Sequence, residues 1–130
     1  MIKKRILNSE RIRRIDGGFS FIPHRFLTDG FLASLNQEEI FLYLFLVLVS
    51  DRHGLSFYSY DAICSLLQFS LDEYIEARDR LIEKDLIAFD GTVFQVLDLP
   101  QRPVPTLAPD KDSEVGRMFR QSLQGVKGGR

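Results

Sequence analysis

The longest hydrophobic stretch in the 130-residue chain is the ten-residue run Ile40 to Val49, IFLYLFLVLV. Its Leu and Phe content favours a helix. Ser34 and Asn36 are each followed three residues later by Gln or Glu, a capping-box pattern that places the helix start just before the run. A helix that is apolar on every side must be covered all round. We therefore expect the N-terminal segment or a second subunit to pack over it.

Shorter periodic segments follow this run. The alternating stretch Leu55 to Ser59 predicts a brief strand. Ser59 is suited to cap a helix over Tyr60 to Leu67, in which apolar residues recur at helical spacing. Ser70, followed three residues later by Glu73, predicts the start of a third helix.

The third helix is predicted to be amphipathic. At about 100° per residue, one arc collects Leu71, Tyr74, Ile75, Leu81 and Ile82, which we expect to be buried. Arg78 lies within this arc and needs a carboxylate or backbone carbonyls as partners. The opposite face carries Asp72, Glu73, Glu76, Asp79, Arg80, Glu83 and Lys84.

After Lys84 the apolar period changes from helical to alternating. Two such runs, LIAF and TVFQVL, flank Asp90-Gly91, which predicts a β-hairpin and favours a type I′ turn. The predicted order is therefore helix, short strand, helix, turn, helix and hairpin.

The segment LLQFSLDEYIEARDRLIEKDLIAFDGTVFQV resembles the second helix, turn, recognition helix and wing of winged helix-turn-helix domains. Gln68 and Asp85 stand where those domains often have small or glycine residues. The resemblance implies an α+β, mainly α fold with a three-helix core and a two- or three-stranded wing. The lead-in FSFIPHRFLTDGFLASLN also resembles winged-helix domains of plasmid replication initiators and mobile elements.

Composition divides the chain into three parts. Residues 1–18 form a basic N-terminal arm, residues 19–99 the winged-helix domain with its lead-in, and residues 100–130 a Pro-rich linker and basic tail. The tail has the pattern of a short helix at 113–124. Net charge is +5 over residues 1–28, −9 over 29–100 and +3 over 101–130, so an acidic body lies between two basic arms.

Catalytic and metal-binding signatures are absent from the sequence. It has no P-loop, dinucleotide-binding turn, nucleophile elbow or HExxH motif. The single cysteine, Cys64, excludes an internal disulfide, and His24 and His53 are far apart in the chain. The apolar run is shorter than the roughly 18 residues that suggest a membrane span. We expect a cytoplasmic protein that is not an enzyme and has no cofactor, metal or membrane partner.

The charged face of the third helix bears on DNA binding. This face carries five acidic residues against two basic ones, Arg80 and Lys84. The carboxylates would repel the phosphates of DNA. The cations of the N-terminal arm suit phosphate contact better, although a basic segment this short can also be a solubilising tail. The predicted DNA-binding residues are Lys3, Lys4, Arg5, Arg11, Arg13, Arg14, Arg80 and Lys84.

Two hypotheses follow from this pattern. The first is a non-enzymatic, DNA-associated winged-helix protein, a small regulator or accessory factor of a mobile element or replication system that contacts duplex phosphates mainly through its arms. The alternative is a protein-interaction module that forms a homodimer through the Ile40 to Val49 helix. In that case a basic protein partner would bind Asp72, Glu73, Glu76 and Glu83.

Overall fold

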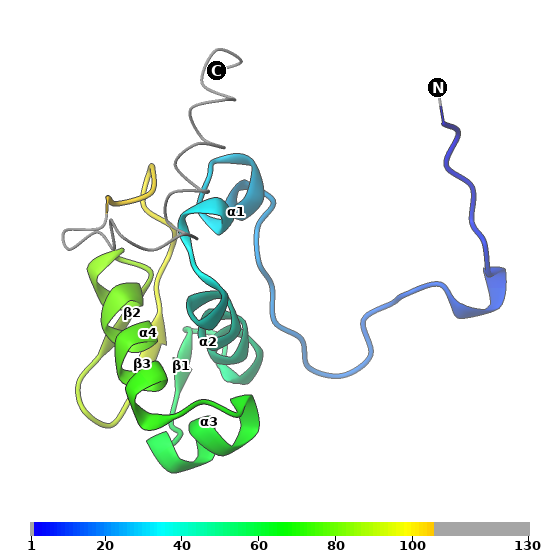
Figure 1. Cartoon of the computed structure of the whole chain (residues 1–130). Coiled ribbons are helices and arrows are strands. Elements are labelled where there is room, and N and C mark those ends of the chain that lie inside the picture. The colour runs from blue at the N-terminus through cyan, green and yellow to red at the C-terminus, as the bar shows by residue number, and fades with distance from the viewer. Residues whose placement is uncertain (1, 106–130) are drawn as a thin grey trace.

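A computed structural model describes residues 2–105 of the chain (Figure 1). Its helices are α1 (Arg25–Thr28), α2 (Gln37–Val49), α3 (Tyr60–Leu67) and α4 (Leu71–Glu83), and its strands are β1 (Leu55–Ser56), β2 (Ile87–Phe89) and β3 (Phe94–Val96). Short 3-10 helices occur at Ser9–Arg11 and Leu32–Ser34. The helix predicted at 113–124 lies outside the described residues.

The three longer helices begin at the predicted capping residues. Asn36 Oδ1 accepts from the Glu39 amide at 2.8 Å, and Ser70 Oγ accepts from the Glu73 amide at 3.1 Å. In both cases the Glu carboxylate accepts in return from the amide of the cap residue, completing a capping box. Ser59 caps α3, and the helix spans the predicted residues.

The strands form one antiparallel sheet in the order β1-β3-β2. β1 is shorter than predicted and pairs Leu55 with Gln95 and Ser56 with Phe94. Gly54, just before β1, has φ +83°, and its carbonyl accepts from the Val96 amide at 2.8 Å. A Cβ at this position would lie 2.4 Å from the Val96 carbonyl oxygen, so the close approach of these two backbones requires glycine.

The hairpin of β2 and β3 forms as predicted, but its turn is not type I′. Phe89 pairs with Phe94, which leaves a four-residue loop. A type I′ turn needs positive φ at both central residues, whereas Gly91 has φ +99° and Asp90 does not have a positive φ. Instead, Asp90 Oδ1 accepts from the amides of Thr92 at 2.9 Å and Val93 at 2.7 Å, and these bonds stabilise the longer loop.

The core lies between α2, α4 and the sheet. Its fully buried side chains include Phe31, Leu35, Leu42, Leu46, Ile63, Leu81, Leu86, Ile87 and Phe94. The predicted winged-helix fold is thus confirmed, with three main helices and a three-stranded wing. The lead-in segment runs beside α2, where Ser20 Oγ donates to the Leu48 carbonyl at 3.4 Å. α2 is nevertheless not covered all round, because Phe41, Leu44 and Leu48 remain exposed along one side.

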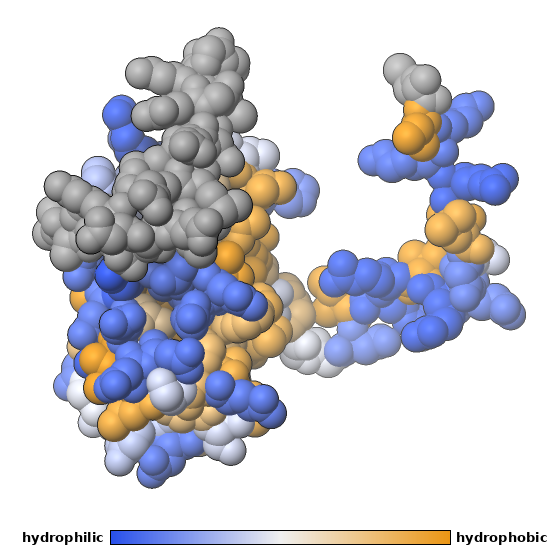
Figure 2. All heavy atoms as spheres, in the orientation of Figure 1, coloured by the Kyte–Doolittle hydropathy of each residue, from blue (hydrophilic) through white to orange (hydrophobic). Residues whose placement is uncertain are grey.

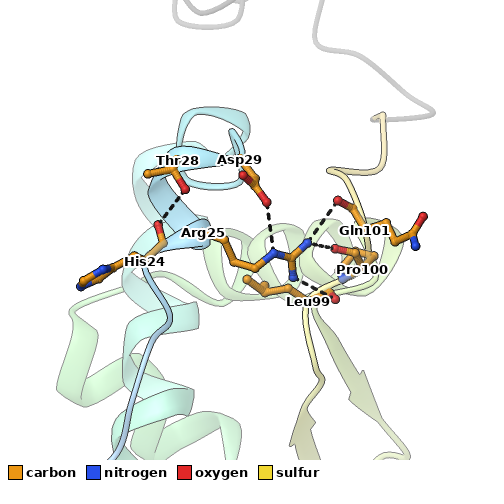
Figure 3. A network of polar contacts seen from close by, with 7 residues as sticks. All are labelled: His24, Arg25, Thr28, Asp29, Leu99, Pro100 and Gln101. Carbon is orange, nitrogen blue, oxygen red and sulfur yellow. Dashed lines mark hydrogen bonds and ion pairs between the residues drawn. The ribbon is translucent and has the colours of Figure 1, made fainter. Parts of the chain in front are cut away.

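Arg25 connects the lead-in to the segment that leaves the sheet (Figure 3). Its guanidinium donates to the carbonyls of Leu99 at 3.3 Å, Pro100 at 2.7 Å and Gln101 at 3.1 Å. It also pairs with Asp29 at 3.1 Å. These contacts use most of the N–H donors of Arg25. This cation therefore stabilises the body.

Candidate nucleic-acid interface

α4 occupies the recognition-helix position of the fold. α3 ends at Gln68, which takes a left-handed conformation with φ +57°, and α4 begins after the Ser70 cap. Asp85, just beyond α4, also has positive φ, at +62°. These are the two positions where the resembled domains often carry small or glycine residues, so the local backbone is kept although the residues differ.

The buried side of α4 differs from the predicted arc. Tyr74, Ala77, Leu81 and Lys84 are buried, whereas Leu71 and Ile82 are exposed and Ile75 is only partly buried. α4 packs on α2, and the small residue Ala77 lies on the buried side of α4, while Leu71 and Ile75 line a groove shared with Phe89 of the wing. Predicting the arc from the largest hydrophobic residues alone was therefore wrong at these positions.

Lys84 does not lie on the exposed face, and this prediction was wrong. Its side chain is 6% exposed, and its Nζ lies 2.6 Å from Glu39 Oε1, whose side chain is 1% exposed. The same ammonium group donates to the Ser34 carbonyl at 2.7 Å. Because Glu39 needs this buried cation, Lys84 fixes α4 to the start of α2 and is not free for phosphate contact.

The exposed face of α4 is strongly acidic. Asp72, Glu73, Glu76, Asp79 and Glu83 are all exposed, while Arg80 is half-buried. Lys84 is not on this face, so its five carboxylates lie beside Arg80 and beside Arg78, which pairs with Asp79. Glu73 also accepts from the Ser70 amide at 2.8 Å, so part of its hydrogen-bonding capacity is used by the helix cap. The face thus remains unfavourable for a DNA duplex, as the sequence indicated.

Arg78 has the carboxylate partner that its position required. Its Nε and Nη2 both lie 3.0 Å from Asp79 Oδ1. The guanidinium is 5.5 Å from the ring centroids of Tyr74 and Phe89, so it stacks against aromatic faces between α4 and the wing. Arg78 is accordingly a neutralised, half-buried cation at the centre of an aromatic region.

The predicted cations of the N-terminal arm are all exposed. Lys3, Lys4, Arg5, Arg11, Arg13 and Arg14 lie on a segment that extends away from the body (Figure 1). Among the described residues, the hydrogen bonds of residues 2–18 stay within that segment, as in the 3.4 Å contact of Arg14 with Asp16. Figure 2 shows hydrophilic and hydrophobic residues interleaved along the arm. The structure does not bring these cations together with Arg80.

Four aromatic residues near α4 were missed by sequence reasoning. Phe57, Tyr58 and Tyr60 follow β1, and together with Phe89 of the wing they line a groove of about 600 Å³ beside α4. The density of aromatic residues in SFYSY is the signal that could have indicated this surface.

The described residues give little support to other chemistry. Burial, together with the nearby Asp61 carboxylate, raises the pKa of the half-buried Cys64 thiol, which disfavours a reactive thiolate. Within residues 2–105, no three His, Cys, Asp or Glu side chains gather as a metal site. In the same part of the chain, no helix has the length and apolar character needed to span a membrane.

Comparisons with known proteins agree with this geometry. Residues 33–87, from the 3-10 helix before α2 to the first residue of β2, match the family model of a helix-turn-helix domain. Searches of curated proteins and of solved structures found no match to the chain. Residues 33–87 are therefore similar to a helix-turn-helix domain, and the three-stranded sheet beside the helices makes the fold that of a winged helix.

Proposed function

We propose that this protein is a non-enzymatic, DNA-associated regulator or accessory factor that contacts duplex phosphates mainly through its basic arms. A helix-turn-helix domain indicates a DNA-binding regulator, because such domains commonly place their second helix in the major groove. A small protein of this kind suits regulation within a mobile element or a replication system. Its place of action would be the DNA of the cytoplasm.

The observation that carries this proposal is the separation of charge between α4 and the arm. The exposed face of α4 presents Arg80 against five acidic residues. The arm presents six exposed cations within residues 3–14. Affinity for a duplex comes largely from cations that displace counterions, so the arm is the favoured contact and α4 supplies Arg80 at most.

The arm is also suited to phosphate contact by its extended shape. Its backbone is irregular except for the 3-10 helix at Ser9–Arg11, which Asn8 caps. The exposed Arg14–Asp16 pair contributes little in water and can exchange for a phosphate. An arm of this kind can follow the phosphate backbone or enter a minor groove.

A salt titration of DNA binding tests the proposal. If all six arm cations contact phosphates, log Kd should change with log salt with a slope of about 5 for full-length protein on random duplex. Replacing the six cations with Gln should abolish most of this slope. Arg80→Gln should reduce it by about one at most. Absence of measurable duplex binding at low salt would contradict the proposal.

A matched variant on α4 tests the electrostatic argument separately. Glu76→Gln with Glu83→Gln removes two exposed carboxylates without altering the caps. If α4 approaches the duplex, this variant should bind more tightly than wild type, and the gain should shrink at high salt. If instead neutralising the arm has no effect and Arg80→Gln abolishes binding, α4 is the main DNA contact.

A protein-interaction module is the second candidate, and the exposed side of α2 favours it. Phe41, Leu44 and Leu48 recur at helical spacing and form an apolar stripe that no described residue covers. Such a stripe suits a homodimer through this helix, while Asp72, Glu73, Glu76 and Glu83 on α4 suit a basic protein. A light-scattering mass equal to the monomer at high concentration, unchanged by Leu48→Ser, would argue against the dimer.

A further inference from the structure

The groove beside α4 is an exposed apolar surface with three walls. Phe57 and Tyr58, which follow β1, and Tyr60, the first residue of α3, form one wall, α4 supplies Tyr74, and the wing supplies Phe89. Phe57 is 71% exposed, so the groove is open to a partner. Single exposed hydrophobic residues are common on protein surfaces, but aromatic residues gathered in one groove indicate a binding surface.

One side of this groove has an acidic border. Leu71, Ile75 and Arg78 of α4 line the groove, and a parallel row of exposed acids at 72, 76, 79 and 83 lies beside them on the same helix. The cation within the groove is already paired, because Asp79 Oδ1 lies 3.0 Å from Arg78 Nη2. The groove therefore suits an extended segment with apolar side chains for the aromatic floor and cations for the border.

The N-terminal arm has this composition. Ile6, Leu7 and Ile12 are each more than half exposed, and they lie between the basic residues 3–5, 11 and 13–14 of the segment. Among the described residues of a single copy, nothing covers these apolar side chains to more than half. The arm and the groove are thus two exposed surfaces of one chain that match in both apolar character and charge.

We propose that the arm of one copy lies in the aromatic groove of a second copy. Ser20 holds the lead-in against α2, and the arm departs from that side of the body, whereas α4 and the wing lie on the other side (Figure 1). The arm therefore extends away from its own groove. The arm of a second copy can reach this groove without any change in the path of its own lead-in.

This self-association goes beyond the proposed function and can be tested without DNA. Ile6→Ser with Leu7→Ser and Ile12→Ser removes the apolar anchors and keeps every arm cation. Phe57→Ser removes the most exposed aromatic side chain of the groove. Because Phe57 is exposed, we expect this variant to fold. Leu66→Ser is the matched control, because Leu66 is 61% exposed on α3 and does not line the groove.

Sedimentation of full-length protein over a concentration series at low salt provides the measurement. We expect concentration-dependent association that Phe57→Ser and the triple arm variant each weaken by about tenfold or more, the effect of losing one or more buried apolar side chains. Leu66→Ser should leave it unchanged. A monomeric mass at every concentration, or equal weakening by Leu66→Ser, would overturn the proposal.

Mixing the two variants distinguishes an arm that binds the groove of another copy from an arm that binds the groove of its own copy. Phe57→Ser retains an intact arm, and the triple arm variant retains an intact groove. In a mixture, the arm of the first can occupy the groove of the second, so association should exceed that of either variant alone. If mixing restores nothing, the arm does not bind the groove of another copy.

Discussion

Replacing Lys84 with Met tests whether this residue stabilises the fold or contacts DNA. The change preserves much of the side-chain length and removes the ammonium group that lies 2.6 Å from Glu39 Oε1 and 2.7 Å from the Ser34 carbonyl. Glu39 would then be a nearly fully buried carboxylate without its counterion, still bonded to the Asn36 amide at 3.3 Å. We therefore expect a large loss of stability.

The expected magnitude follows from the burial of both partners. Breaking a buried ion pair by removing one partner costs about 3–5 kcal/mol, because the remaining charge is uncompensated. A domain of this size has a total unfolding free energy of about 5–15 kcal/mol, so the loss would be a large share of it. At about 4–8 °C per kcal/mol, the thermal midpoint should fall by at least about 12 °C.

Urea unfolding of four proteins provides the assay: wild type, Lys84→Met, Glu39→Gln and the double variant. Gln at position 39 can still accept from the Asn36 amide, so the double variant should recover much of the stability lost in Lys84→Met. Arg80→Met, one turn earlier on α4, is the control and should cost far less. A loss below about 1 kcal/mol for Lys84→Met, together with weaker DNA binding, would refute a structural role.

Three further predictions concern the sheet and its turns. Ser56→Ala should stabilise the protein by about 1 kcal/mol in urea unfolding, because the buried Ser56 hydroxyl has no hydrogen-bond partner within the described structure. Gly54→Ala should destabilise it by at least about 1–3 kcal/mol, and far more than Gly91→Ala, since both glycines have positive φ but only Gly54 faces a backbone atom, the Val96 oxygen. The amides of the wing loop lower the pKa of Asp90 below its ordinary 3.8, so the stabilisation present above that pH should be lost as pH falls through the lowered pKa. Acidification should therefore reduce the urea midpoint of wild type more than that of Asp90→Asn, and equal reductions would contradict this reasoning.

Local signals predicted the three longer helices and the hairpin, but not the short helix α1. A capping box needs only residues three apart, so Asn36 and Ser70 marked their helix starts from sequence alone. The Asp-Gly pair located the hairpin, but the turn type also depends on where strand pairing stops. Pairing stops at Phe89 and Phe94, and the loop is longer as a result.

The candidate site was predicted less completely because its surfaces depend on contacts between distant residues. Glu39 is 45 positions from Lys84, and no periodicity in α4 indicates that the two meet. The buried side of α4 depends on which of its faces packs on α2, and that side includes Ala77 but not Leu71 or Ile82. The groove joins three segments that only the tertiary fold brings together. By contrast, the exposure of the arm cations followed from their sequence.

The contacts of Arg25 place the beginning and end of the compact body at one point. Its donors hold carbonyls 74, 75 and 76 residues further along the chain, so the body forms a nearly closed loop of polypeptide. Because the two ends of the body lie close together, we expect it to tolerate circular permutation, in which new termini are placed in the exposed wing loop around Gly91. For the same reason, the domain could be inserted into a surface loop of another protein without forcing the two ends of that loop apart.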